Sequence, residues 1–306
     1  MLRIASLLPS ATEIVCALGA ADGLIGISHE CDFPPEIRGR PVLTRSRIDS
    51  TATSRAIDAA VRQVIAGALS IYDVDAAQLA QLAPDVIVTQ DLCEVCAVSL
   101  DDVRAAVARL AHRDHIQIVT LHPTRLADVL GDVERVATGI GVAGRGAAVR
   151  AELERRISVT AAIAARAAAT TRPRVVSLEW IDPLMLGGTW MPELIELAGG
   201  QPVGAAAGAP APTVSPADLA ALAPDVIVVK PCGFTLPRAL AERAVIERDV
   251  IAAVPRARVY VTDGNAYFNR PGPRLVESLE IMAACVHPDR FADLQRAHGH
   301  AIARLA

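Results

Sequence analysis

The sequence predicts an α/β protein of two Rossmann-like lobes with parallel sheets, joined by a long backbone helix. Three observations predict this fold: a ten-residue segment that recurs later in the chain, an alternation of apolar strands with helices, and a central stretch of helical composition. Strands that alternate with helices form parallel sheets with right-handed crossovers. With 306 residues, the chain is about twice the usual length of a domain, so two lobes fit its length.

The internal repeat is the strongest of these observations. The sequence Leu-Ala-Gln-Leu-Ala-Pro-Asp-Val-Ile-Val begins at Leu79, and it recurs from Leu219, 140 residues later, with Ala221 in place of Gln81. In both copies a short helix ends, Pro-Asp makes the turn, and Val-Ile-Val forms a buried strand. The two segments therefore predict equivalent strands in two separate sheets.

Two weaker matches in the same order support a duplication. Residues 3–7 resemble residues 174–178, and each segment is an apolar strand that precedes a helix. Residues 13–19 then resemble residues 193–199, and in each case a glycine closes the helix. The opening strand and first helix are thus predicted to occur once in each lobe.

The predicted elements follow from this repeat and from hydrophobic periodicity. In the first lobe we expect strands near 2–8, 23–28, 85–89 and 116–120, and helices near 10–19, 54–67, 75–83 and 99–111. In the second lobe we expect strands near 173–178, 225–229 and 258–263, and helices near 190–198, 215–222, 235–248 and 273–285, with a last helix after Pro288. The predicted domains are 1–123, a helical linker 124–169, and 170–306.

The linker contains the sequence Gly139-Ile-Gly-Val-Ala-Gly144, which matches the dinucleotide-binding pattern G-x-G-x-x-G. It follows a helical pattern rather than a strand, so the structural context of that fingerprint is missing. We interpret it as a break between two helices. The second of these, 145–168, is predicted to be the rigid connection between the lobes.

Composition excludes several classes of protein. Hydrophobic residues make up 52% of the chain and charged residues 21%, which is enough for a sizeable core. The pI of about 6.0, the net charge of −4 and the scattered basic residues argue against a nucleic-acid partner. No apolar stretch approaches the roughly 18–20 residues that span a bilayer. We therefore expect no membrane insertion, and we expect a monomer.

The amino terminus bears on localisation. Its apolar run, Leu2–Leu8, is short, contains Arg3 and leads into a helix start at Pro9-Ser10, so it does not resemble a secretory signal. We expect a cytoplasmic protein, or a periplasmic one if a leader has been removed.

The unusual side chains of the chain follow the predicted strands. Ligands of open parallel sheets bind beyond the carboxyl ends of the strands, and a chain with 3% aromatic residues that places them there predicts a binding surface. We expect a small ligand to bind in a cleft between the lobes. The predicted contacts are Ser10, Thr12, His29, Glu30, Gln90, Glu179, Trp180, Trp190, Phe234, Asn265, Tyr267 and Arg270.

Four cysteines also follow strands, namely Cys31, Cys93, Cys96 and Cys232. A Cys-x-x-Cys motif occurs in zinc sites, iron–sulfur sites and thiol redox sites. Four thiolates from converging strands would suit zinc or an iron–sulfur cluster. The alternatives are contact with a ligand and simple burial, because cysteine is among the most buried residue types. We predict that at least three of these sulfur atoms share one metal.

The motifs resemble the cobalamin-binding members of the substrate-binding protein superfamily of ABC importers. The resemblance covers nearly the whole chain and is carried by the opening Ile4–Glu13, by Leu-x-x-Leu-x-Pro-Asp-Val-Ile in both lobes, and by Pro192–Gly199. It implies the class III fold, in which one backbone helix bridges two lobes. It also implies cobalamin or a related corrinoid as the ligand, with Trp180 and Trp190 as apolar walls and with Ser10 and Thr12 as polar contacts.

This chain departs from the transport members, because it shows no leader and contains cysteine-bearing segments that indicate a distinct branch. The partner is therefore expected to be an ABC importer or, in the cytoplasm, a corrinoid enzyme.

Three functions compete. The first is binding of a corrinoid or a related metal chelate, without catalysis and with no catalytic residue. The second is an enzyme in which the cysteines hold a metal or cluster and Glu30, Glu179 or Asp263 performs acid–base chemistry. The third is an interaction module without a ligand. No nucleophile elbow or H-E-x-x-H motif favours the second.

Overall fold

The computed structural model describes residues 2–66, 71–90, 104 and 116–306. The chain divides into two compact units. Unit 1 comprises Met1–Ala52, Ala56–Pro123 and Ala127–Glu152, and unit 2 comprises Thr53–Arg55, Thr124–Leu126 and Leu153–Ala306. The predicted helix 99–111 lies outside the described residues, apart from position 104.

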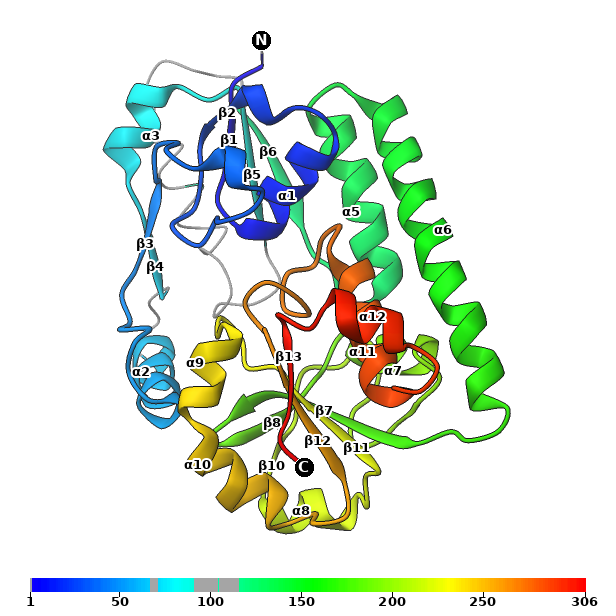
Figure 1. Cartoon of the computed structure of the whole chain (residues 1–306). Coiled ribbons are helices and arrows are strands. Elements are labelled where there is room, and N and C mark those ends of the chain that lie inside the picture. Colours follow the sequence, from blue (N-terminus) through cyan, green and yellow to red (C-terminus); the bar gives the residue numbers. More distant parts are fainter. Residues whose placement is uncertain (1, 67–70, 91–103, 105–115) are drawn as a thin grey trace. The chain divides into compact units, whose positions relative to one another are not determined.

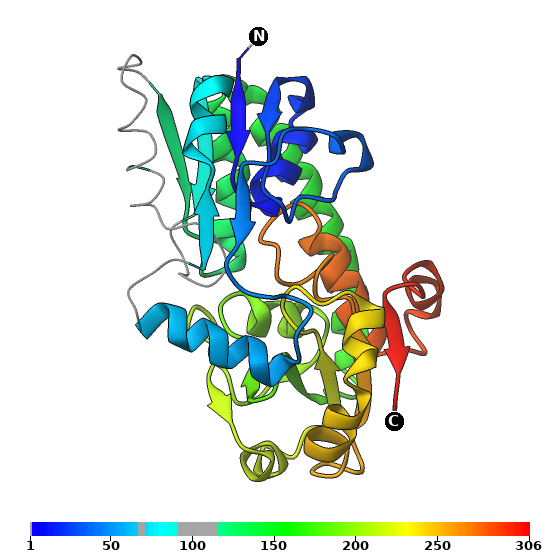
Figure 2. The same ribbon diagram turned by 90° about the vertical axis from the view of Figure 1, so that its left-hand side faces the viewer.

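Unit 1 is built on a parallel sheet, as predicted. Its four strands have the order β2-β1-β5-β6, and all three neighbouring pairs are parallel. The strands are β1 (Ile4–Ser6), β2 (Leu24–Gly26), β5 (Val86–Gln90) and β6 (Gln117–Leu121). Figure 2 shows β6 at one edge of this sheet. Every residue of β1 and β5 is buried, as expected for central strands with helices on both faces.

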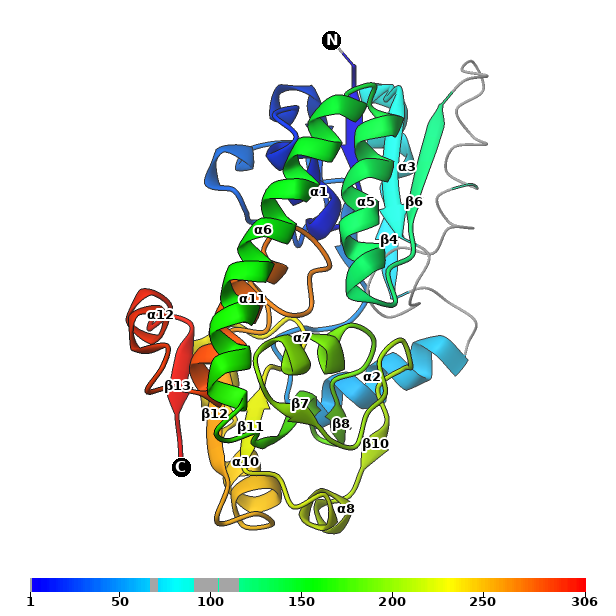
Figure 3. The ribbon, with the colours of Figure 1, turned by 90° about the vertical axis from the view of Figure 1, so that its right-hand side faces the viewer.

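Helices cover both faces of this sheet. On one face, Leu79 of α3 packs into a core cluster with Ala5, Leu7 and Ile87. On the other face, α5 approaches β6 so closely that a Cβ atom on Gly139 would lie 2.4 Å from the side chain of Val119. Figure 3 shows α5 beside the first part of α6. The helices in this part of the chain are α1 (Pro9–Ala17), α2 (Ser54–Ala66), α3 (Ala76–Leu82), α5 (Leu126–Gly139) and α6 (Ala143–Ala168), and the residues of α2, α5 and α6 are divided between the two units.

The sequence did not predict the small antiparallel hairpin of unit 1. It pairs β3 (Thr44–Ser46) with β4 (Tyr72–Val74). Strands of three residues are too short for their periodicity to be recognised, and cross-strand pairing stabilises them. Two short 3₁₀ helices, Ala21–Gly23 and Pro35–Ile37, flank β2 and the loop that follows it.

Unit 2 contains a larger, mixed sheet with the order β10-β8-β7-β11-β12-β13, and β9 also pairs with β7. Its centre, β7-β11-β12, is parallel as predicted, whereas β8, β10 and β13 are antiparallel. The antiparallel strands were not predicted. The strands are β7 (Arg174–Ile181), β8 (Leu184–Leu186), β9 (Gln201–Pro202), β10 (Thr213–Val214), β11 (Val226–Val229), β12 (Arg258–Thr262) and β13 (Ile302–Arg304).

The helices of unit 2 follow the predicted order (Figure 1). One predicted helix, 235–248, is divided into α9 and α10 and continues as a π-helical turn, Glu247–Ile251. The other helices are α7 (Met191–Leu197), α8 (Pro216–Ala221), α11 (Leu275–Val286) and α12 (Ala292–Ala297), and the divided one comprises α9 (Leu236–Ala241) and α10 (Arg243–Ile246).

The glycine-rich stretch of the linker is a helix break, as interpreted from its context. Helix α5 ends at Gly139 and α6 begins at Ala143, and Gly141 between them has a φ of +74°. Glycine adopts this left-handed conformation without steric cost. Helix α6 matches the predicted backbone helix and continues from unit 1 into unit 2. Throughout the described ranges, no helix is both long and apolar enough to cross a membrane.

Candidate functional site

The carboxyl ends of the parallel strands hold most of the side chains that the sequence singles out. In unit 1 these side chains follow β1, β2 and β5. In unit 2 they follow β7, β11 and β12.

A chain of hydroxyl groups follows β1 in unit 1. Thr12 Oγ1 donates to Ser6 Oγ at 2.8 Å, and Ser6 Oγ donates to the Leu8 carbonyl at 3.1 Å. Cys31 Sγ lies 3.1 Å from Thr12 Oγ1. Because the single hydroxyl proton of Thr12 is directed to Ser6, the sulfur must be the donor in this contact. Thr12 therefore holds Cys31 as a protonated thiol.

His29 occupies the loop after β2, and its hydrogen bonds define its tautomer. Thr44 Oγ1 donates to Ser28 Oγ at 3.0 Å and lies 2.7 Å from His29 Nδ1. Since the Thr44 proton is committed to Ser28, Nδ1 is the donor to Thr44. In a neutral imidazole, Nε2 then carries the lone pair.

The electrostatics of His29 favour this neutral form. One side of the residue is open to solvent, but burial of the remainder lowers the pKa of His29 below its usual value. The Glu30 carboxylate offsets this effect only in part. His29 therefore presents an unprotonated Nε2 at neutral pH, the form in which histidine binds metals.

The sequence did not single out two aromatic residues of unit 1, Tyr72 and Phe33, and Tyr72 packs against His29. The ring of Tyr72, in β4, lies 5.2 Å from the His29 ring, and Tyr72 donates to Glu30 Oε1 at 2.9 Å. Phe33 is 39% exposed, a large value for an apolar side chain. The sequence could have indicated Phe33, because this aromatic residue precedes two prolines in a predicted loop and belongs to no apolar periodic pattern.

The other predicted contacts of unit 1 are buried. Ser10 lies in the first turn of α1, and its Oγ forms no hydrogen bond within the described residues. Gln90 ends β5 and is also buried. Cys93 and Cys96, which follow it in the chain, lie outside the described residues.

In unit 2, a buried lysine follows β11. Lys230 has no exposed side-chain surface, and its Nζ donates to Asn269 Oδ1 at 2.9 Å. The same Nζ lies 3.6 Å from Glu179 Oε2, which also accepts from the Gly188 amide at 3.2 Å. The ammonium thus connects the ends of two strands with the loop that follows β12.

Trp180, near the end of β7, and Phe234, which follows β11, form a buried aromatic pair. Their ring centroids are 5.2 Å apart, and the Arg238 guanidinium lies 4.2 Å from the Phe234 centroid. Trp180 Nε1 donates to the carbonyl oxygens of Ser54 and Asp182, at 3.3 and 3.2 Å. Both aromatic side chains therefore have packing roles within unit 2.

Trp190 is 6% exposed, and its Nε1 donates to the Phe268 carbonyl at 3.0 Å. Its position is that of a core side chain whose polar atom is satisfied, as buried tryptophan requires. The predicted role of Trp180 and Trp190 as walls for a ligand stays a prediction.

The loop after β12 carries the remaining predicted contacts. Arg270 is buried and donates to Asn265 Oδ1 at 3.0 Å. Tyr267 lies between these two residues in the chain, and its Oη is 3.3 Å from His300 Nε2.

The carboxylates proposed for acid–base chemistry have structural partners. Asp263 accepts from the amides of Ala266 and Leu236, at 2.7 and 3.2 Å. Glu179 and Glu30 have the partners given above. These contacts favour positioning roles over catalysis.

The cysteine site cannot be assembled from the described residues. Cys31 belongs to unit 1, and Cys232, whose amide donates to the Glu179 carbonyl at 3.0 Å, belongs to unit 2. Within the described part of the chain, no three His, Cys, Asp or Glu side chains form a metal-binding group. The shared metal site stays a prediction.

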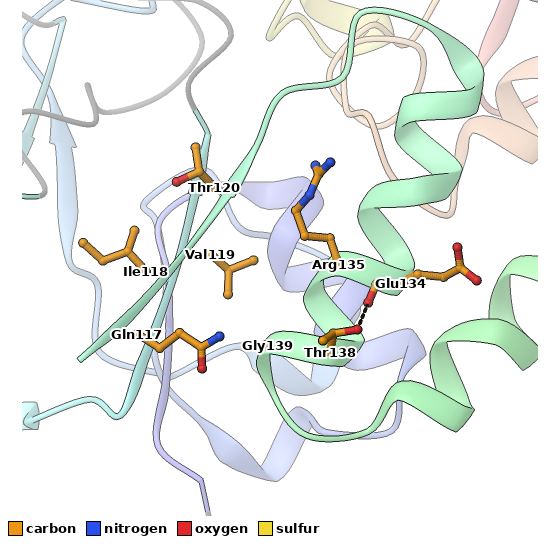
Figure 4. A pocket seen from close by; sticks show the side chains of 8 residues that line it. All are labelled: Gln117, Ile118, Val119, Thr120, Glu134, Arg135, Thr138 and Gly139. Carbon is orange, nitrogen blue, oxygen red and sulfur yellow. Dashed lines mark hydrogen bonds between the residues drawn. The ribbon is translucent and has the colours of Figure 1, made fainter. Parts of the chain in front are cut away.

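A shallow hollow of about 410 Å³ lies elsewhere in unit 1, between β6 and the second half of α5 (Figure 4). It is lined by Gln117, Ile118, Val119, Thr120, Glu134, Arg135, Thr138 and Gly139. The hollow begins at the amino end of β6, whereas ligands of parallel sheets bind at the carboxyl ends. We therefore assign it no ligand.

Comparisons with known proteins agree with this architecture. A periplasmic heme-binding protein from Pseudomonas aeruginosa is 18% identical, with a TM-score of 0.68, and the match covers 99% of this chain and 95% of that one. The apo form of the periplasmic heme-binding protein RhuT from Roseiflexus sp. RS-1 is 22% identical, with a TM-score of 0.67 and coverage of 96% and 98%.

The periplasmic vitamin B12-binding protein BtuF of Vibrio cholerae is 20% identical, with a TM-score of 0.61 and coverage of 96% and 98%. No curated protein sequence matches the chain. The profile of the family described as Periplasmic binding protein matches residues 4–266. The predicted two-lobed, class III fold is confirmed, and the chain belongs to the Periplasmic binding protein family.

Proposed function

We propose that this protein binds a metal-bearing macrocycle, either a corrinoid such as cobalamin or a heme, and that His29 coordinates the metal. The single observation that carries the proposal is the hydrogen-bond chain from His29 Nδ1 through Thr44 to Ser28. A hydrogen bond at one ring nitrogen fixes the tautomer and orients the other nitrogen toward a metal. His29 therefore offers Nε2 as a ligand without further rearrangement.

The surroundings of His29 suit a flat apolar ligand. Phe33 exposes an aromatic face four residues after His29, and Tyr72 packs against the histidine ring. A planar aromatic surface buries a large area at a low cost in conformational entropy. The heme- and B12-binding proteins of the same fold support the class of ligand.

Between His29 and Cys31, the hydrogen bonds favour the histidine as the ligand. A metal binds the thiolate, whereas Cys31 must donate its proton to Thr12. His29, in contrast, is neutral and has its lone pair on the outer nitrogen. An ABC importer that would receive the ligand is the partner that we propose for this function.

The test is an absorbance titration of the full chain with hydroxocobalamin, cobinamide and hemin, using wild type, His29→Ala and His122→Ala. His122 is an exposed histidine of the same unit and serves as the matched control. We expect one of the three ligands to bind with a shifted metal spectrum. His29→Ala should weaken its binding at least tenfold and abolish the shift, and His122→Ala should change neither.

The pH dependence gives a second measurement. Because protonation of Nε2 competes with the metal, affinity should fall as the pH decreases through the lowered pKa of His29, and it should be constant above it. Unchanged affinity in His29→Ala would refute the assigned ligand. Absence of binding for all three compounds would refute the macrocycle.

A further inference from the structure

Three rings in unit 2, all distant in sequence from the His29 loop, surround a common point. Tyr267 lies in the loop after β12, His298 follows the end of α12, and His300 precedes β13; these elements are labelled in Figure 1. The distances between the ring centroids are 6.4 Å for Tyr267–His298, 6.5 Å for Tyr267–His300 and 6.4 Å for His298–His300. The centroids therefore form a nearly equilateral triangle.

The size of this triangle leaves room for a metal ion between the two histidine rings. A point equidistant from the three centroids lies about 3.7 Å from each of them. A coordinating imidazole has its nitrogen about 2.1 Å from the ion, so its ring centre lies about 3.2 Å away. The centre of each histidine ring is thus within about half an ångström of the distance that a coordinating imidazole has.

The polar atoms of two rings already face each other. Tyr267 Oη lies 3.3 Å from His300 Nε2. Two ligands of one ion, each about 2.1 Å from it at a tetrahedral angle, are about 3.4 Å apart. The observed separation is that of a long hydrogen bond, and it is also the spacing of two ligands of one ion.

The third ring, that of His298, is oriented by the carboxylate of Glu280. His298 Nε2 lies 2.8 Å from Glu280 Oε2, and Arg156 holds the other oxygen of that carboxylate at 3.0 Å. The remaining nitrogen of His298, Nδ1, is then available as a ligand. A carboxylate that holds one nitrogen of a histidine while the other binds metal is a recurrent arrangement in metal sites.

We propose that Tyr267, His298 and His300 form a second site of this protein, which binds a divalent first-row transition cation that prefers imidazole, such as Ni²⁺, Cu²⁺ or Zn²⁺. The phenol oxygen is the third ligand, which explains why no three His, Cys, Asp or Glu side chains of the described residues form such a site. The proposal is independent of the macrocycle, because no residue of the His29 loop takes part.

The charges around the site limit its affinity. The Arg274 guanidinium lies 5.5 Å from the Tyr267 ring centroid and repels a cation. Glu277 and Glu280 share the single guanidinium of Arg156, which leaves one negative charge in excess beside His298. With these effects opposed, and with one neutral phenol among three ligands, we expect micromolar rather than nanomolar binding.

The test is a calorimetric titration of untagged protein with Ni²⁺, together with absorption spectra, for wild type, His300→Ala, Tyr267→Phe and the control His122→Ala. His300 is exposed, so its replacement should leave the fold intact. We expect one Ni²⁺ per chain, a loss of at least tenfold in affinity in His300→Ala, and a loss of about threefold or more in Tyr267→Phe. His122→Ala and His29→Ala should bind Ni²⁺ like wild type.

Two results would overturn the proposal. One is Ni²⁺ affinity in His300→Ala equal to that of wild type. The other is a strong near-ultraviolet thiolate-to-nickel band, which would assign the bound ion to the cysteines, because nitrogen and oxygen ligands produce no such band. Circular dichroism of each variant separates a loss of ligands from a loss of structure.

Discussion

At the amino ends of their central strands, the two units make the same contacts. In unit 1, Arg3 donates through its guanidinium to the carbonyl oxygens of Leu82 and Ala83, and its amide donates to Asp85 Oδ2 at 2.9 Å. In unit 2, Arg174 donates to the carbonyl oxygens of Leu222 and Ala223, and its amide donates to Asp225 Oδ2 at 2.8 Å.

The backbone conformation and strand pairing of the repeated segments are also the same in the two units. Ala83 and Ala223 have positive φ angles of 43° and 44°. Val86 and Val226 each pair with the residue after the arginine, Ile4 in one unit and Val175 in the other. The recurring Leu-Ala-Pro-Asp-Val-Ile-Val sequence thus specifies a complete local structure twice.

The carboxyl ends of the same strands differ. At the last equivalent position of the repeat, unit 1 has Gln90 and unit 2 has the buried Lys230. Unit 1 presents hydroxyl groups and an imidazole, with an exposed aromatic ring at Phe33. Unit 2 fills the corresponding edge with buried aromatic rings and a charged pair. The amino ends of the strands thus make the same structural contacts in both units, whereas the carboxyl ends differ in their side chains. This is expected, because ligands of parallel sheets bind at the carboxyl ends.

The prediction with the largest effect compares the buried Trp190 of unit 2 with the more exposed Phe33 of unit 1. Trp190→Ala should destabilise the protein by about 3–5 kcal/mol, because it removes a buried side chain from a packed core. Phe33→Ala should change the free energy of unfolding much less, by about 1 kcal/mol, since 39% of this residue is exposed. Urea denaturation measures both. A small loss for Trp190→Ala, together with weakened ligand binding, would instead restore its predicted role as a wall.

The prediction with an intermediate effect tests whether the arginine contacts at the amino ends of the central strands stabilise the two units equally. Arg3→Ala and Arg174→Ala should each cost about 1–2 kcal/mol, because each removes hydrogen bonds from a guanidinium to backbone carbonyls. The two losses should agree within about 0.5 kcal/mol in chemical denaturation. A clear inequality would show that the shared contacts contribute differently in the two units.

The smallest effect compares a buried carboxyl group of unit 1 with the buried lysine of unit 2. Asp132, on α5, has no exposed surface, and its Oδ2 forms no hydrogen bond within the described residues. Burial raises its pKa from 3.8 to about 6, although the neighbouring Arg135 opposes this shift. Lys230, equally buried, has both an acceptor and a carboxylate nearby.

Since the pKa of Asp132 is higher in the folded state, its contribution to stability is complete below pH 3.8 and is lost as the pH rises through about 6. Asp132→Asn should remove this dependence and, near pH 7, should stabilise the protein by no more than about 1 kcal/mol, because the loss of the ion pair with Arg135 offsets most of the gain from removing the buried charge. Thermal unfolding between pH 4 and 7 measures it, with the exposed Asp22→Asn as control. An equal pH dependence in Asp132→Asn and wild type would refute the assignment.

By itself, the sequence determined the repeat, the parallel core strands and the long helix, because these elements are encoded locally by periodicity, proline and glycine. It did not predict β3, β4, β8, β10 or β13, since strands of two or three residues are stabilised by their partners. The candidate site was likewise predicted from the sequence only in part. The sequence identified His29, but the proton of Thr44, donated to Ser28, decided which nitrogen is offered.

The tertiary structure also decided the position of the aromatic residues. The sequence placed Trp190 and Phe33 in similar segments after strands, yet one is buried in a core and the other is exposed. The physical reason is that burial and hydrogen-bond direction depend on side chains far apart in the sequence. The pattern within one segment specifies a strand or a helix, whereas the role of a side chain depends on what the rest of the fold packs against it.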